Sequence, residues 1–323
     1  MGLHTPRQTR RPELVRSVSY PYQVHGTRTA PPRPKRFWNT GKVLVAIFAV
    51  GLAGFLFLSP GGSNEHTLEA SSNSQTPQKE ALPPAPKQLD HTAFSAEINA
   101  VIAEYKSVDI GVSWIDIETG DSHDYGVQDP FVAASTAKLL TAIAFLHDVE
   151  NGTNSLNDTV GSRSAKAALE AMIVKSDNDA WHDFNNTVMS HEELAEYANK
   201  IGFSSYDPDK NTITPGSLAK LLSNFYQKRL LNEEHTNLLL SYMKQAYEAQ
   251  VQYIPDLAPN GTTVYHKPGY LKDRMHDAAI VDNGGRPYVL VIFTKSRTGV
   301  YDPTVGADIF TRVAKASFTS FNQ

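Results

Sequence analysis

The chain has 323 residues, 41% of them hydrophobic, which is enough for a substantial core in one large domain or two smaller ones. It contains no cysteine, which excludes disulfides, thiol catalysis and cysteine metal sites. The net charge of −4 hides a division, because residues 1–42 hold nine basic side chains and one acid, whereas the rest holds 21 basic and 33 acidic ones. This acidic body argues against nucleic acid as a partner.

Three segments precede the part of the chain that has the pattern of a folded domain. Residues 1–42 are rich in Arg and Pro without periodic apolar spacing, so we expect a disordered basic tail, with a nucleic-acid-binding tail as the alternative. Residues 43–58 contain no polar side chain and fall slightly short of the roughly 20 residues of a full membrane span. Residues 59–90, rich in Pro and Ser, predict a linker.

The basic residues before the apolar segment predict its orientation in a membrane. Positive charge favours the cytoplasmic side, which places the tail in the cytoplasm and the rest of the chain outside. A cleaved signal peptide has a similar pattern, but here the leading region is unusually long and no clear A-x-A site follows. We therefore expect an uncleaved transmembrane signal anchor that crosses the cell membrane once and leaves residues 91–323 extracytoplasmic.

Hydrophobic periodicity predicts one domain over residues 91–323. Helical spacing covers residues 91–106, 135–151, 165–175, 191–202, 215–250 and 305–321. Strand-like patterns cover residues 109–118, 122–127, 262–271, 275–281 and 288–294. This order predicts an α+β fold of the three-layer α/β/α type, in which one antiparallel sheet is built from both ends of the domain and the helical middle is an insertion.

A hydroxyl and an amine stand at the start of the second helical pattern. Ser135 and Lys138 are three residues apart, so they share one helix face. A serine needs a nearby base to become a nucleophile, and a lysine can serve when burial or neighbouring cations lower its pKa. The spacing alone is a weak signal, because it recurs at residues 217–220 and 241–244, where an ordinary surface pair is the simpler interpretation.

Two further polar stretches accompany this pair. Ser176-Asp177-Asn178 follows a helical pattern, and His266-Lys267-Pro268-Gly269 lies inside a strand pattern. Together the three stretches supply the nucleophile, proton relay, amide and cation that acyl transfer to a serine needs. Taken singly, the first is also a common helix-ending loop, Lys267 could be a solvated strand residue, and Gly269 could mark a bulge or a close approach of the backbone.

The order S-x-x-K, S-D-N, K-x-G resembles the motif set of class A β-lactamases and penicillin-binding proteins, over about residues 91–323. The resemblance implies a β-lactamase/D,D-peptidase-like fold. It implies that Ser135 is the acylated nucleophile and that Lys138 is its base or part of the relay. Ser176 would then pass the proton to the leaving nitrogen.

The same resemblance implies the residues that bind the substrate. Asn178 would bind the side-chain amide, and Lys267 would keep the region electropositive. The backbone N–H groups of Ser135 and of Tyr270, the residue after Gly269, would form the oxyanion hole. We expect no cofactor. We also expect no metal site, because the histidines are not at metal-ligand spacing. We expect a structural role for Asp177, structural or surface positions for His266 and His276, and core positions for Trp181 and Tyr265.

The sequence departs from the family pattern at two places. Pro268 stands where the family has a threonine or serine whose hydroxyl helps to hold the substrate carboxylate, and Arg274 is our hypothesis for a replacement. Pro268 also confines its strand to a sheet edge or a bulge. The loop over residues 202–212 contains no Glu to activate the deacylating water; Asp207 and Asp209 are its only carboxylates, and a role in turning the loop is the simpler interpretation.

We therefore expect a membrane-anchored, extracytoplasmic, monomeric serine hydrolase of the class A β-lactamase type, with slow turnover of β-lactams. One alternative is a D,D-peptidase acting on peptidoglycan stem peptides. Another is a non-catalytic wall-binding or sensor domain that kept the fold.

Overall fold

The computed structural model describes residues 89–248 and 251–321. The predicted tail, the predicted membrane span and nearly all of the predicted linker lie outside these residues. Among the helices that the structure describes, none combines the length and the apolarity that a bilayer crossing requires.

A five-stranded antiparallel sheet forms the middle layer, in the order β2-β1-β9-β8-β7. Its strands are β1 (Val108–Asp116), β2 (Ser122–Gly126), β7 (Thr263–Leu271), β8 (Arg274–Asp282) and β9 (Tyr288–Ser296). The central strand β9 is buried at all but one position, which explains its nearly continuous apolar sequence. The sheet thus joins both ends of the domain, as the sequence predicted, and the strand with Pro268 is at an edge.

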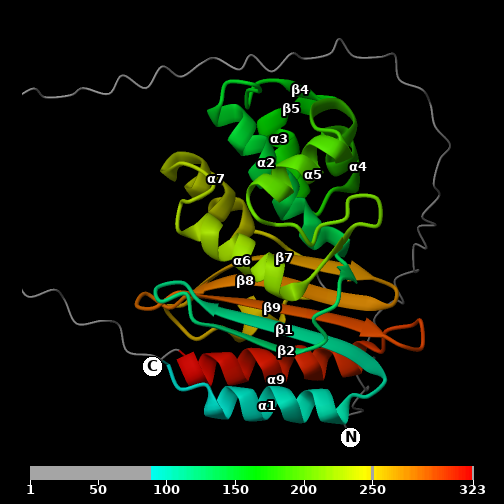
Figure 1. The fold of residues 1–323 in the computed structure, drawn as a ribbon, viewed down its shortest axis with the longest axis vertical. Coiled ribbons are helices and arrows are strands. Elements are labelled where there is room, and N and C mark those ends of the chain that lie inside the picture. The colour runs from blue at the N-terminus through cyan, green and yellow to red at the C-terminus, as the bar shows by residue number, and fades with distance from the viewer. Residues whose placement is uncertain (1–88, 249–250, 322–323) are drawn as a thin grey trace, which may run out of the picture. The chain divides into compact units, whose positions relative to one another are not determined.

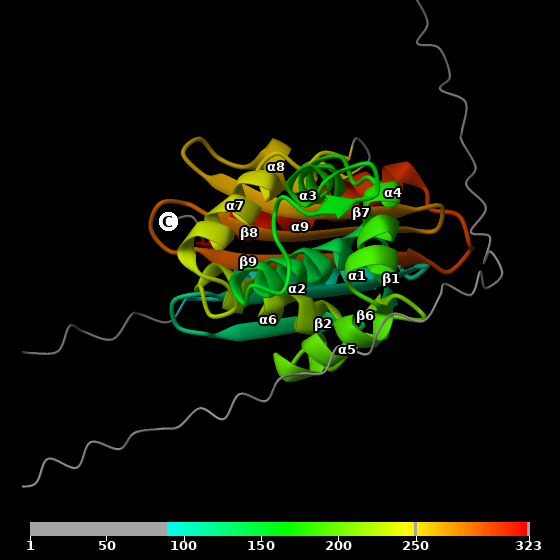
Figure 2. The same cartoon turned by 90° about the horizontal axis from the view of Figure 1, so that it is seen from above.

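Helices cover both faces of the sheet (Figure 1). One face packs against α1 (Thr92–Glu104), α8 (Tyr253–Leu257) and α9 (Pro303–Phe321). Figure 2 shows the helical block over the other face. The block contains α2 (Lys138–Glu150), α3 (Ala165–Val174), α4 (Asn178–Asp183), α5 (His191–Lys200), α6 (Pro215–Tyr226) and α7 (Glu233–Met243). Each face of the sheet therefore has its own hydrophobic core.

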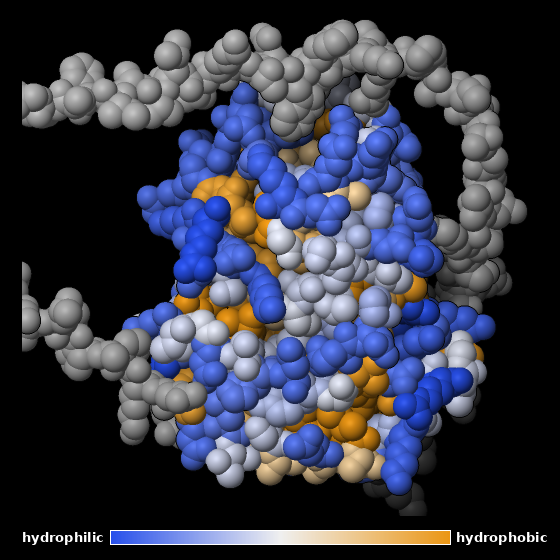
Figure 3. Space-filling model, in the orientation of Figure 1, coloured by the Kyte–Doolittle hydropathy of each residue, from blue (hydrophilic) through white to orange (hydrophobic). Residues whose placement is uncertain are grey.

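Local sequence signals explain where several of these helices begin. Ser190 and Glu193 form a reciprocal capping box at the start of α5. The side chain of Thr214 caps α6, and Pro215 occupies its first turn, where a missing N–H costs nothing. In the orientation of Figure 3, hydrophilic side chains predominate on the surface and apolar ones form smaller areas between them.

The structure also differs in detail from the predicted elements. The helical pattern over residues 215–250 is divided into α6 and α7 by a turn in which Lys228 has a φ of +58°. The short helices α4 and α8 were not predicted, because five or six residues are too few to show a helical period. Ser135 lies in a 3-10 turn, η1 (Ala134–Ala137), directly before α2 rather than in the α-helix itself.

Candidate active site

The segment with Ser135 is fixed to the sheet just before the serine. Strand β3 (Phe131–Val132) pairs with β6 (Thr212–Ile213), and the carbonyl of Val132 accepts a hydrogen bond from His276 Nε2 at 2.9 Å. Ala134 then has a φ of +51°, a backbone conformation that residues other than glycine rarely adopt. Such strain persists only where the surroundings impose it, and it is common at functional sites.

Lys138 lies at the centre of a group of oxygens. Its side chain is fully buried, and its Nζ is 3.1 Å from Ser135 Oγ. It is 2.7 Å from the carbonyl oxygen of Ser176, 3.4 Å from Ser176 Oγ and 2.7 Å from Asn178 Oδ1. The structure therefore brings together four of the predicted site residues, which come from segments about 40 positions apart in the chain.

The surroundings of Lys138 favour its neutral form. Burial lowers the pKa of this amine to about 6, and the charge of Lys267 acts in the same direction. A neutral amine has two N–H groups and one lone pair. The two oxygens at 2.7 Å, of Ser176 and Asn178, can accept both N–H groups. The lone pair is then available to the hydroxyl of Ser135, as a general base requires.

Ser176 connects the two lysines. Its Oγ accepts a hydrogen bond from Lys267 Nζ at 3.0 Å. The backbone of Ser176 has a φ of +54°, which turns the chain between α3 and α4. Next to it, the Asp177 side chain accepts hydrogen bonds from the N–H groups of Asp179 and Ala180 and so caps α4, the structural role that the sequence predicted.

Lys267 has a different protonation state from Lys138. It is fully buried, and burial lowers its pKa to about 8, while the charges of Glu248 and Asp277 oppose this shift. At pH 7 it is therefore mostly an ammonium group, whereas Lys138 is mostly neutral. Two amines whose surroundings separate their pKa values in this way can act as a base and as a fixed positive charge.

Gly269 allows the edge strand to approach the turn that contains Ser135. A side-chain carbon built at this glycine would lie 3.1 Å from the Ala133 carbonyl oxygen, 3.2 Å from Ala134 Cβ and 3.2 Å from Ser135 N. The backbone of the edge strand thus lies close to the Ser135 turn, which was one of the two interpretations of Gly269 from the sequence. The following residue, Tyr270, is half-buried, and its side chain packs against the core between the sheet and α9.

The structure shows the contacts of Arg274 and of the loop over residues 202–212, where the sequence departs from the family pattern. The Arg274 guanidinium binds both carboxylate oxygens of its neighbour Asp273, at 2.7 and 2.6 Å, so its charge is already paired. In the short loop, Asp207 accepts hydrogen bonds from the N–H groups of Asp209 and Lys210 and forms an ion pair with Lys210 Nζ. Asp207 therefore stabilises the turn, as the sequence predicted.

Sequence reasoning missed several supporting contacts. His276 was expected to be structural or at the surface; it is fully buried, and its hydrogen bond to the Ser135 segment could not be inferred. Trp181 was assigned to the core; it packs at the core's edge, with its ring 5.5 Å from Lys138 Nζ. The buried pair of His266 and Asp277, with contacts of 3.0 Å, lies beside Lys267. No spacing in the sequence signals these contacts, since they join different strands and helices.

Known proteins resemble this chain in sequence and in fold. The β-lactamases PSE-4 and PSE-1 of Pseudomonas aeruginosa are each 24% identical over an alignment of 190 residues. The match covers 47% of this chain and 66% of each relative, just under two thirds of the relatives' length. The structure of PBP-A matches 72% of this chain and 99% of its own, with a TM-score of 0.65 and 23% identity.

A β-lactamase from Chitinophaga pinensis matches 70% of this chain and 98% of its own, with a TM-score of 0.63 and 18% identity. At such identities the structural matches establish the fold. The sequence profile of the β-lactamase enzyme family matches residues 93–321, which is most of the chain and all three motifs. The protein belongs to the β-lactamase enzyme family.

Proposed function

We propose that this chain is an active-site serine hydrolase of the class A β-lactamase type, in which Ser135 is acylated by a β-lactam or by a peptide of similar shape. The observation that best supports this is the 3.1 Å contact between Lys138 Nζ and Ser135 Oγ, at a buried amine whose pKa is lowered to about 6. A domain that binds its ligand without forming a covalent bond would make no use of a neutral lysine beside a serine.

Acylation would use the groups in the following order. Ser135 Oγ attacks the substrate carbonyl carbon and forms a C–O bond, and its proton moves to Lys138 Nζ. The C–N bond then breaks, and the leaving nitrogen receives a proton from Ser176 Oγ. Ser176 recovers a proton from Lys138, whose Nζ is 3.4 Å away, so that the relay returns to its starting state.

The remaining predicted residues would bind the substrate and the charge that develops on it. The N–H groups of Ser135 and Tyr270 would stabilise the oxyanion, which the close approach at Gly269 favours. The exposed Asn178 would contact the substrate amide, and the Lys267 ammonium would attract a carboxylate. With Pro268 in place of a hydroxyl residue, recognition of that carboxylate depends more strongly on Lys267.

Hydrolysis of the acyl-enzyme would be slow. In the loop over residues 202–212, the Asp207 carboxylate accepts a hydrogen bond from the Asp209 N–H and pairs with Lys210. The loop contains no Glu to activate water. A D,D-peptidase acting on peptidoglycan stem peptides is therefore the second candidate. A mutant of the structurally similar PBP-A is described as an acyl-enzyme complex with penicillin G, and it has 22% identity to this chain and a TM-score of 0.65.

The cellular setting is also part of the proposal. The apolar residues 43–58, preceded by nine basic side chains, support a single membrane anchor with the Ser135 domain outside the cytoplasm. A β-lactam or a peptidoglycan peptide would be available to the enzyme on that side.

The direct test is covalent labelling of the full-length chain with a fluorescent penicillin. The wild-type chain is expected to acquire one label per chain on Ser135, identified by peptide mass spectrometry. Ser135→Ala should lose the label completely. Ser241→Ala is the matched control, because Ser241 belongs to an exposed Ser-x-x-Lys pair and its Oγ only donates to the Leu238 carbonyl. Equal labelling of the wild type and Ser135→Ala would refute the proposal.

A second prediction concerns Gly269. Gly269→Ala places a carbon 3.1 to 3.2 Å from the Ala133–Ser135 backbone, so the edge strand must move by a few tenths of an ångström. We expect the labelling rate to fall roughly 10-fold or more, because small displacements of reacting groups are costly. Gly285→Ala is the control, since its new carbon would meet only Asn283 Oδ1 at 3.8 Å. Similar labelling rates for both variants would exclude a positioning role for Gly269.

A further inference from the structure

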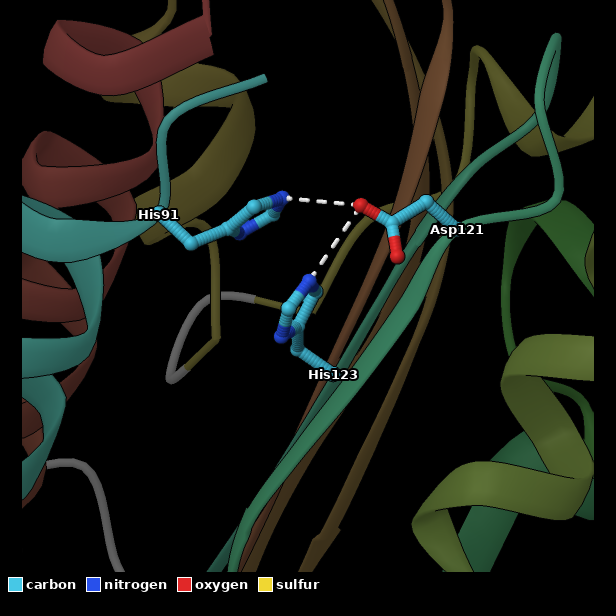
Figure 4. Close-up of side chains that lie close together, drawn as sticks. All are labelled: His91, Asp121 and His123. Atoms are coloured by element: carbon cyan, nitrogen blue, oxygen red, sulfur yellow. Dashed lines mark hydrogen bonds and ion pairs between the residues drawn. The ribbon is translucent and has the colours of Figure 1, made fainter. Parts of the chain in front are cut away.

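Two histidines and an aspartate meet at the edge of the sheet opposite the strand with Lys267 (Figure 4). His91 directly precedes α1, while Asp121 and His123 lie two residues apart at the start of β2. Asp121 Oδ2 is 3.6 Å from His91 Nε2 and 3.3 Å from His123 Nε2. One ligand atom from each of the three residues lies within 4.8 Å of the others.

His91 is the unusual member of this cluster. Its side chain is only 9% exposed, yet neither of its ring nitrogens has a hydrogen-bond partner. A buried polar group without a partner is destabilising, and such groups in folded proteins call for a specific explanation. The rings of Trp114 and Phe321, with centroids 4.3 and 4.8 Å away, surround the imidazole without offering an acceptor.

The cluster offers two imidazoles and a carboxylate, side chains that transition-metal ions commonly bind in proteins. The two imidazole rings stack with centroids 3.8 Å apart; because a bound ion lies in the plane of each ring, the partly exposed ring of His123 would turn to bind it. A neutral imidazole beside a carboxylate presents a nitrogen lone pair, which is what a metal ion requires.

We propose that His91 Nε2, Asp121 Oδ2 and His123 Nε2 bind a divalent transition-metal ion of the zinc type, with water as the fourth ligand. Ligands about 2.0–2.2 Å from a tetrahedral zinc are separated by roughly 3.3–3.6 Å. The two histidine–aspartate distances of 3.6 and 3.3 Å match this spacing. Imidazole nitrogens favour zinc, copper or nickel over calcium and magnesium, which prefer oxygen ligands.

The position of the cluster indicates a stabilising role. His91 is close to the first described residue, and Phe321, in contact with it, is the last one, so the cluster lies where both ends of the described domain meet the β1–β2 hairpin. An ion bound there would attach the start of α1 to the hairpin. Because β2 and β7 are opposite edges of the sheet, the ion would take no part in chemistry at Ser135.

No metal site was expected from the sequence, because its histidines are not at the short spacing that is typical of metal ligands. His91 is 30 residues from Asp121. Only the pairing of β2 with β1 brings Asp121 and His123 to the start of α1, where His91 lies. The alternating pair Asp121 and His123, on one face of a strand, is common without any metal. The third ligand therefore had to come from the tertiary structure.

The test uses the full-length chain, stripped with a chelator and titrated with zinc in a calorimeter. We expect one zinc ion per chain and, at about 100 times the dissociation constant, a rise in the unfolding temperature of roughly 5–10 °C. Asp121→Asn and His123→Gln should each lose the binding and the rise. His191→Gln should keep both, because His191 is an exposed histidine outside the cluster.

Cobalt(II) gives an independent readout, because its tetrahedral coordination produces intense visible absorption. This absorption should appear in the wild type and in His191→Gln, and it should be absent from Asp121→Asn and His123→Gln. Equal zinc binding in the wild type and His123→Gln, or no rise in unfolding temperature with zinc, would overturn the proposal. Penicillin labelling of Ser135 should be the same with and without zinc, so that failure of the metal site and failure of the proposed enzyme activity are seen separately.

Discussion

Replacing Lys138 by methionine is expected to slow acylation of Ser135 by about 10²- to 10⁴-fold, the usual contribution of a general base. Methionine approximately fills the space of the buried lysine stem but offers no lone pair to the Ser135 hydroxyl, 3.1 Å away. The measurement is the rate of covalent labelling by a fluorescent penicillin under single-turnover conditions. Lys244→Met is the control, because Lys244 belongs to an exposed Ser-x-x-Lys pair.

The pH dependence of the same rate distinguishes a base from a structural lysine. The pKa of Lys138 is lowered to about 6, so its neutral form predominates above pH 6 and is lost below it. The wild-type labelling rate should therefore fall about tenfold per pH unit below pH 6 and level off above it. A rate that stays constant down to pH 5 would show that Lys138 is not the base, even if Lys138→Met were impaired.

The acyl-enzyme formed with penicillin is expected to persist, because the loop over residues 202–212 contains no Glu to activate the deacylating water. Missing general-base assistance costs about 10²- to 10⁴-fold in rate. The only carboxylates in the loop over residues 202–212 are Asp207 and Asp209, and Asp207 forms the turn with Lys210. We therefore expect labelled Ser135 to remain for many minutes after free penicillin is removed.

A pulse-chase experiment measures this persistence. The chain is labelled, excess fluorescent penicillin is destroyed, and the label on Ser135 is followed by gel fluorescence and mass spectrometry. Asp207→Asn serves as the comparison, because it removes the charge and keeps the side chain's size. If the label is lost within seconds in the wild type and persists in Asp207→Asn, then Asp207 is a deacylating base and our interpretation of the loop is wrong.

Much of the fold followed from sequence pattern alone. The strand-like patterns predicted the five strands of the sheet to within a few residues. Pro268 predicted that its strand lies at an edge or contains a bulge, because proline cannot donate to a neighbouring strand, and β7 is an edge strand. The helices α4 and α8 could not be predicted, since their sequences are shorter than two helical turns.

The candidate site divides in a similar way. The sequence by itself determined which residues are present: two hydroxyls, two amines, an amide and a glycine, in an order typical of one family. The separate protonation states of Lys138 and Lys267 were decided by the tertiary structure, because burial and the distance between charges set a pKa. The same holds for the cluster of His91, Asp121 and His123, whose members meet only when α1 packs against β2. Side-chain identity is local information, whereas proximity and exclusion of water arise only when distant segments pack together.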